Sequence, residues 1–225
     1  MITADLKTQH KSKAEKVGEV DRVYRLIKAW LLECRLPPGD ILSEVELARE
    51  CNTSRTPVRE ACNRLAQDGW ITRIRQKGYI VTPVSVRDVL QLYEYRKLLE
   101  CFAAEKAAQV TSAEQLVRLA RCIEVEQSGD VDINEIVAAN ELFHLGIAEV
   151  ASNQRVYSQL KLTLEYVHRL DTLSTQKSRG WIPHGEILSS LQGHKPNEAR
   201  QAMASHIDYA RDRMLDLLGS QSLLH

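Results

Sequence analysis

Apolar side chains recur at helical spacing over most of this chain and divide it into a series of elements. Between residues 20 and 31 they fall three or four positions apart, which predicts an amphipathic helix with one buried face. These positions are Val20, Val23, Tyr24, Ile27, Trp30 and Leu31. The preceding residues 1–18 carry few large apolar side chains, so we expect a flexible tail there. The turn at residues 36–39 ends this first helix.

Two short helices are predicted next. Ser43 precedes the first, and Glu46 stands at its third helical position, as in a capping box. Thr56 can cap the second through its side-chain oxygen, with Pro57 at the first helical position. The apolar face of the second helix consists of Val58, Ala61, Cys62, Leu65 and Ala66. A connection as short as residues 52–55 is typical of a helix-turn-helix.

A small hairpin follows these helices. Residues 70–75 alternate apolar with polar side chains, as a half-buried strand does, and residues 79–82 can pair back onto them. At the tip, residues 76–78, Gly78 allows a positive φ and a close approach of the backbone to a ligand. The pattern predicts a wing beside the second helix of the helix-turn-helix, followed by a linker at residues 83–86.

Beyond the linker the chain shows only helical periodicity. Six helices are expected, at residues 86–109, 113–128, 132–151, 154–175, 179–193 and 196–218. Ser112 with Gln115, a second capping box, marks one of the borders. The predicted fold class is therefore mostly α: an N-terminal winged helix-turn-helix at residues 19–82 and a C-terminal all-α six-helix bundle at residues 87–218. A short tail is expected at residues 219–225.

Charge points to an anionic partner for the first part of the chain. The net charge is zero, which argues against a general nucleic-acid binder. Residues 54–79 nevertheless hold six Lys or Arg side chains against two acidic ones. Arg55 and Arg59 both lie near a helix N-terminus, which already carries partial positive charge. This arrangement suits docking onto the phosphates and guanine edges of DNA.

Composition excludes several other classes of protein. The five cysteines lack CxxC spacing, so buried reduced thiols are expected rather than disulfides or a zinc-thiolate site. No signal-like segment and no apolar run near ~18 residues occur, which predicts a cytoplasmic protein without a membrane span. HExxH, GxSxG, P-loop and GxGxxG motifs are missing, so the sequence does not indicate an enzyme.

The N-terminal part carries a set of motifs that covers roughly residues 19–82. They are LPPGD at 36–40, LSE at 42–44, LA at 47–48, SRTPVREA at 54–61, RL at 64–65, DG at 68–69, and Gly78. This set resembles the winged-helix domain of GntR-superfamily bacterial transcription regulators. The resemblance implies that double-stranded operator DNA is contacted by Ser54, Arg55, Thr56, Arg59, Lys77 and Gly78. Family members commonly carry an arginine where this chain has Val45, which implies a different operator preference.

One polar constellation stands out in the helical part. Asn140 and His144 lie four residues apart, hence on one helical face, and His184 and His206 follow on two later helices. Apolar neighbours at helical spacing around the histidines favour an inward orientation. Three imidazoles that converge inside a bundle can hold a divalent transition metal. The alternative is that these are ordinary core or surface histidines.

Three further motifs fit a known ligand-binding domain. They are Tyr93-x-x-Arg96-x-x-Leu99-Glu100, Asn140-x-x-Phe143-His144-x-x-Ile147-Ala148 and Met203-x-x-His206-Ile207. They resemble the FCD domain of FadR-type regulators, over roughly residues 86–218. The resemblance implies a divalent metal, with Zn²⁺ or Ni²⁺ preferred, at Asn140, His144, His184 and His206, and a carboxylate effector near Arg96.

Two of these residues leave alternatives open. Asn140 offers a neutral oxygen where the acidic version of the site has a carboxylate, so a bound ion keeps its full positive charge. Such a site favours an anionic effector, and the alternative is a weaker or empty site. Arg96 either binds the effector or forms a surface salt bridge with Glu100.

These observations predict a homodimeric, effector-responsive transcription regulator, in which two recognition helices read a palindromic operator. The family habit implies a repressor that a small carboxylate releases from DNA. One alternative is a metal-ion sensor that uses the same residues. Another is a metal-dependent hydrolase, because a three-histidine site with an open position can activate water.

Overall fold

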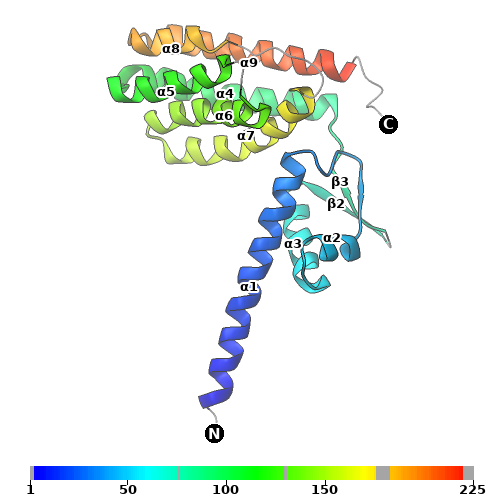
Figure 1. Ribbon diagram of the computed structural model, residues 1–225. Helices are drawn as coiled ribbons and strands as arrows, with labels where there is room; N and C mark the ends of the chain where they lie inside the picture. The colour runs from blue at the N-terminus through cyan, green and yellow to red at the C-terminus, as the bar shows by residue number, and fades with distance from the viewer. Residues whose placement is uncertain (1–2, 76, 129–130, 176–182, 220–225) are drawn as a thin grey trace. The chain divides into compact units, whose positions relative to one another are not determined.

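The computed structural model describes residues 3–75, 77–128, 131–175 and 183–219 (Figure 1). The chain divides into two compact units, Met1–Val84 and Ser85–His225, and the division falls inside the predicted linker. Over the described residues the chain is mostly helical, with one small antiparallel sheet in the first unit. The predicted fold class is thereby confirmed.

The first helix, α1 (Thr3–Leu32), is longer than expected. Residues 1–18 were predicted to be a flexible tail, but from Thr3 onward the structure has them in helix (Figure 1). Residues 3–17 contain neither proline nor glycine, and nine of these fifteen residues are Lys, Ala, Leu, Gln or Glu, which have high helix propensity. The part of α1 that begins at Val20 packs against α3 (Arg55–Gln67), as its apolar spacing requires.

The helix-turn-helix consists of α2 (Glu44–Glu50) and α3. Ser43 caps α2, but its hydroxyl accepts from the backbone N–H of Val45, 3.3 Å away, and not from the third helical residue. The recognition helix α3 begins at Arg55, with Ser54 as N-cap, which corrects the predicted start at Thr56. Pro57 is thus the third helical residue. Its missing N–H still costs no helical bond, because the first turn leaves these donors unpaired.

The wing is built on a three-stranded antiparallel sheet with strand order β1-β3-β2. The strands are β1 (Ile41–Leu42), β2 (Ile71–Ile74) and β3 (Gly78–Val81). The predicted hairpin corresponds to β2 and β3, whereas β1 was not predicted, because two residues are too short to show an alternating pattern. Gln76, at the predicted tip, lies outside the described residues.

Gly78 is required by the sheet itself. Its φ is +96°, and a Cβ at this position would lie 2.3 Å from the backbone carbonyl oxygen of Leu42 on β1. Gly78→Ala should therefore combine backbone strain with a backbone clash and destabilise the first unit by roughly 1–3 kcal/mol or more. Denaturant unfolding of the variant measures this loss.

Gly39 provides the matched control for that substitution. Its φ is +90°, but a Cβ there would meet nothing within 4 Å. Gly39→Ala should cost only the strain of a positive φ, roughly 1 kcal/mol. Equal destabilisation by the two variants would contradict the role given to the contact between Gly78 and Leu42.

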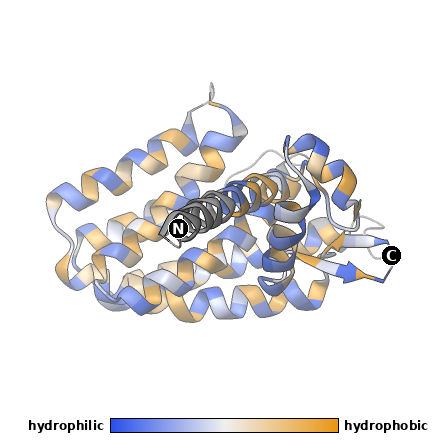
Figure 2. Cartoon of the chain, turned by 90° about the horizontal axis from the view of Figure 1, so that it is seen from below, coloured by the Kyte–Doolittle hydropathy of each residue, from blue (hydrophilic) through white to orange (hydrophobic). Residues whose placement is uncertain are grey.

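The described residues of the second unit form the six helices that the sequence predicted. They are α4 (Val86–Val110), α5 (Ala113–Gln127), α6 (Ile133–Val150), α7 (Gln154–Thr175), α8 (Gly185–Gln192) and α9 (Pro196–Gly219). Figure 2 shows hydrophobic and hydrophilic residues interspersed along the helices. Helix α4 packs most extensively against α9 and also contacts α6, α7 and α8, so it is central to the bundle. No helix in the described part of the chain is apolar over a length sufficient for a membrane crossing.

Capping residues in the sequence correctly predict where most helices of this bundle begin. Ser85 caps α4 and Ser112 caps α5, each in a full capping box. Helix α8 begins at Gly185, later than the predicted residue 179, and residues 179–182 lie outside the described ones. His184 is therefore the N-cap residue of α8 and not a helical residue.

Candidate metal centre and nucleic-acid interface

The structure brings the three predicted histidines together inside the second unit. His144 lies on α6, His184 caps α8 and His206 lies on α9. One ring nitrogen of each lies within 4.8 Å of the others, and all three side chains are buried. Nε2 of His144 and Nε2 of His184 are 3.2 Å apart. The ring centroid of His206 lies 4.3 Å from that of His184. We call these residues the three-histidine cluster.

Two buried carboxylates contact the outer nitrogens of this cluster. Glu100 of α4 contacts Nδ1 of His144, and Oε2 of Glu126, on α5, lies 2.7 Å from Nδ1 of His184. Each Nδ1–H can thus donate to a carboxylate, which leaves the lone pair of each Nε2 facing the other ring. Burial lowers the pKa of His144 to about 4 even though Glu100 opposes this shift. The imidazole is therefore neutral near pH 7, the form that binds metals.

Arg96 belongs to the same cluster of side chains. Its Nε pairs with Glu100, one helical turn away, and its Nη2 lies 3.0 Å from Nε2 of His144. The salt bridge that the sequence left open therefore exists, but it is buried, with Arg96 only 2% exposed. Burial alone would raise the pKa of Glu100, but Arg96 and His144 together lower it to about 2. A charged guanidinium thus lies against the histidines, where it can bind an anion.

Asn140 stands one turn before His144 on α6 and is buried. Its Nδ2 lies 3.4 Å from Oδ2 of Asp171 on α7, so the amide oxygen is the atom that it can offer as a ligand. Burial raises the pKa of Asp171 to about 6. The carboxyl group of Asp171 thus lies next to the neutral amide of Asn140.

Glu126 and Asp171 are absent from the site residues that the sequence predicted. Glu126 follows Leu119 and Ile123 at helical spacing, on the buried stripe of α5. Asp171 lies seven residues after the buried Leu164, on the inner stripe of α7. Acidic residues are rarely buried without a partner, so an acid on an apolar stripe is the signal that could have identified both.

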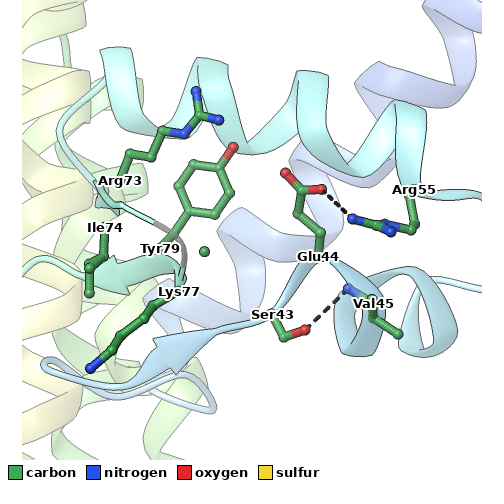
Figure 3. A pocket seen from close by; sticks show the side chains of 9 residues that line it. Ser43, Glu44, Val45, Arg55, Arg73, Ile74, Lys77 and Tyr79 are labelled. Atoms are coloured by element: carbon green, nitrogen blue, oxygen red, sulfur yellow. Dashed lines mark hydrogen bonds and ion pairs between the residues drawn. The ribbon is translucent and has the colours of Figure 1, made fainter.

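The residues predicted to contact DNA lie in the first unit, on α3 and the wing. Ser54, Arg55, Thr56, Arg59 and Lys77 are all exposed. A groove of about 310 Å³ separates the N-termini of α2 and α3 from the wing (Figure 3). It is lined by Ser43, Glu44, Val45, Arg55, Arg73, Ile74, Lys77, Gly78 and Tyr79. The structure thus brings Arg55, Lys77 and Gly78 to one groove.

This groove is cationic, and one acid stands within it. Arg55 lines it from α3, Arg73 from β2, and Lys77 from the turn of the hairpin. Glu44, the first residue of α2, pairs with both Arg55 and Arg59. Because the side chains of Arg55 and Arg59 are still 59% and 53% exposed, both can reach an outside ligand. Such a surface can dock on phosphates and on base edges.

Two families of known sequences match this chain. Residues 19–81 match the bacterial regulatory proteins of the gntR family. Residues 91–209 match the FCD domain, so that this domain alone accounts for more than half of the chain. The first match contains the helix-turn-helix and the wing, and the second contains His144, His184 and His206.

Individual relatives agree with these matches. The Nta operon transcriptional regulator of Aminobacter aminovorans is 28% identical over 80% of this chain and 87% of its own length. The HTH-type transcriptional repressor RspR of Escherichia coli K12 is 26% identical over 83% of this chain and 84% of its own. Among solved structures, E. coli McbR/YncC superposes with a TM-score of 0.75 at 20% identity, covering 89% of this chain and 98% of that one. A likeness at this identity supports the fold alone.

Proposed function

We propose that this chain, which belongs to the GntR family of bacterial regulatory proteins and carries an FCD ligand-binding domain, is a metabolite-controlled repressor. In this proposal a homodimer binds a palindromic operator and senses a small carboxylate at the three-histidine cluster. The observation that carries it is the convergence of His144, His184 and His206 in the domain that the family uses for ligands. The word repressor in the name of one relative, RspR, supports repression rather than activation.

The operator-binding surface of this proposal is α3 with the wing. Ser54, Arg55, Thr56 and Arg59 stand at the start of α3. Lys77 lies in the turn of the hairpin, and Gly78 begins its return strand, β3. In a helix-turn-helix the N-terminal residues of the recognition helix contact base edges in the major groove. A homodimer would present two such helices to an inverted repeat.

Arg55→Ala should reduce discrimination between the operator and unrelated DNA by roughly 1–3 kcal/mol, because a bidentate contact to guanine is worth about that much. Binding of the purified variant to operator and scrambled duplexes, followed by fluorescence anisotropy, measures the difference. Arg35→Ala is the control, since Arg35 is equally exposed but pairs with Glu50 outside the predicted surface. Equal weakening of Arg55→Ala on both duplexes would contradict base readout.

The residues of the three-histidine cluster fit a divalent metal. The three imidazoles are buried and each places a ring nitrogen within 4.8 Å of the others, so together they offer three nitrogen donors to one ion. Glu100 and Glu126 orient His144 and His184 from behind, as carboxylates behind metal-binding histidines do. We propose His144, His184 and His206 as ligands, with the amide oxygen of Asn140 as the fourth. Imidazole-rich sites of this type suit Zn²⁺ or Ni²⁺.

Arg96 is the residue that extends this site toward an effector. When bound, the metal supplies an open coordination position for an anionic oxygen. Arg96, whose Nη2 contacts His144, can give a charge-assisted hydrogen bond to the same carboxylate. Because Asn140 is neutral, the ion is not neutralised by a ligand at that position, which favours an anion over a neutral molecule.

The regulatory step of the proposal is a two-state equilibrium. An effector that contacts α4 through Arg96, α6 through His144 and α9 through His206 favours the arrangement of helices in which all three residues converge. The shift in operator affinity cannot exceed the difference in effector affinity between the two states. A metal-ion sensor, in which the ion itself is the signal, remains the second candidate because it uses the same histidines.

Elemental analysis of gently purified protein tests the proposal first, followed by thermal shifts with small carboxylic acids on metal-loaded and chelated samples. Stoichiometric metal together with an acid that stabilises only the loaded form supports a metal-dependent metabolite sensor. Stoichiometric metal with no response to any acid favours the metal-ion sensor. Absence of metal and of any metal-dependent thermal shift would indicate that the histidines have a purely structural role.

A further inference from the structure

An acid lies at the centre of the surface proposed to bind the operator. Glu44 is the first residue of α2, its side chain is 13% exposed, and in the groove it points toward Arg55 (Figure 3). Arg59 reaches the same carboxylate with two nitrogens, with Nε 3.1 Å from Oε1 and Nη2 2.9 Å from Oε2. Arg55 makes a single, longer contact, 3.4 Å from its Nη2 to Oε2. Glu44 thus connects α2 with two arginines of the recognition helix.

This carboxylate carries a negative charge, which opposes binding to DNA. Hydrogen bonding from Arg59 is the main cause that lowers the pKa of Glu44, so the group is ionised near pH 7. Affinity for DNA comes largely from cations that neutralise phosphates, and an anion on the same surface opposes it. A role for Glu44 on this surface must therefore lie in how the arginines are oriented.

The geometry of Arg59 shows what that orientation achieves. A guanidinium has five N–H donors in a fixed plane. Glu44 takes the side edge of Arg59, formed by Nε and one N–H of Nη2. The end edge, formed by Nη1 and the other N–H of Nη2, remains available for a second bidentate acceptor. Guanine presents such a pair of acceptors, O6 and N7, in the major groove. Arg59 is 53% exposed, so this edge is within reach of DNA.

We propose that Glu44 is a specificity-determining positioning residue, which holds Arg59 in the orientation that reads guanine and weakens binding to other sequences. The inference rests on the proposed operator binding. It also accounts for how α2 takes part in readout although Val45, its next residue, offers no hydrogen-bonding side chain. Arg55, held by one longer contact, is free to exchange Glu44 for a phosphate.

Selection of bound sequences from a pool of DNA duplexes with a randomised central segment tests this inference with the full-length protein. The wild-type chain should enrich an inverted repeat. Glu44→Gln should enrich a motif that is weaker at one guanine of each half-site, and its preference for the wild-type motif over scrambled DNA should fall roughly tenfold. Its affinity for scrambled DNA should rise, because one negative charge is lost.

Glu46→Gln is the matched control. Glu46 lies in the same first turn of α2 and is exposed. In the described part of the chain, Arg55 and Arg59 form their ion pairs with Glu44 and not with Glu46. This variant also removes one negative charge, so it should strengthen binding to all DNA while it retains the wild-type motif. If Glu44→Gln retains the motif in the same way, the inference is overturned. If the wild-type chain enriches no sequence at all, the proposed operator binding fails as well.

Arg59→Lys provides a second route to the same conclusion, since lysine keeps the charge but lacks the planar fork. It should lose the same guanine preference as Glu44→Gln, and the double variant should lose little more than either single one, because both act on one contact. Additive losses would show that Glu44 does not act through Arg59. Thermal melting of each variant establishes that the winged unit remains folded, so that a lost preference is not a loss of structure.

Discussion

Replacing His144 and His206 together by alanine is expected to abolish metal binding and effector response while DNA binding is largely retained. Both residues belong to the three-histidine cluster of the second unit, whereas the recognition helix lies in the first. With one histidine and one amide left, too few ligands remain, and the bound metal should fall from about one ion per chain to less than a tenth of that. Elemental analysis and anisotropy with the selected operator measure the two effects.

His194→Ala is the control for this double variant. His194 is exposed and its Nδ1 contacts the backbone oxygen of Ala108, away from the cluster. It should keep both the metal and the response. If the double alanine variant still contains stoichiometric metal, or responds to an effector as the wild type does, the site is not the one proposed. A His206→Gln variant, which preserves volume, separates loss of ligands from loss of packing.

Glu100→Ala is expected to destabilise the second unit by about 3–5 kcal/mol, because it leaves a buried charge without its partner. Arg96 is 2% exposed and its Nε pairs with this carboxylate, which also contacts Nδ1 of His144. Removing Glu100 leaves the guanidinium of Arg96 and Nδ1 of His144 buried without this acceptor. Denaturant unfolding of chelator-treated protein measures the loss without a contribution from bound metal.

Glu105→Ala, on the same helix, is the control that removes one partner of an exposed ion pair instead of a buried one. Glu105 pairs with Arg200 at 2.8 Å, but the two side chains are 30% and 61% exposed. A surface pair of this type contributes about 0–1 kcal/mol, so this variant should stay close to wild type. A Glu100→Ala loss within that same range would contradict the stabilising role given to the buried pair of Arg96 and Glu100.

Much of the architecture follows from local sequence. Ser85 and Ser112 begin helices because a capping side chain and its partner lie three residues apart. The recognition helix shows in the apolar spacing from Val58 to Ala66. Four of the five apolar residues predicted on this face are buried, namely Val58, Ala61, Cys62 and Leu65, whereas Ala66 is half-buried. Such signals need no knowledge of the tertiary structure, which explains why the predicted fold class is confirmed.

The features that were missed depend on contacts between distant parts of the chain. Strand β1 forms because Leu42 pairs with Tyr79, and two residues carry no periodicity of their own. Glu126 contacts His184, 58 residues away, so the apolar stripe around it could indicate its burial but not its partner. The burial of Arg96 was equally hidden, since an arginine and a glutamate four residues apart suggest a surface pair. The apolar neighbours of the three histidines predicted that these side chains face inward, and the resemblance to a known family pattern implied that they share one site.

The most direct test of the proposed function is the operator affinity of the full-length protein, metal-loaded or chelated, across a panel of small mono-, di- and tricarboxylic acids. A duplex from the sequence selection serves as the probe. The proposal predicts that at least one acid weakens operator binding of the loaded protein, roughly five- to 150-fold for a typical coupling energy, and leaves the chelated protein unchanged. An operator affinity that is the same with and without every acid, or that changes equally in both samples, would contradict metal-dependent effector control.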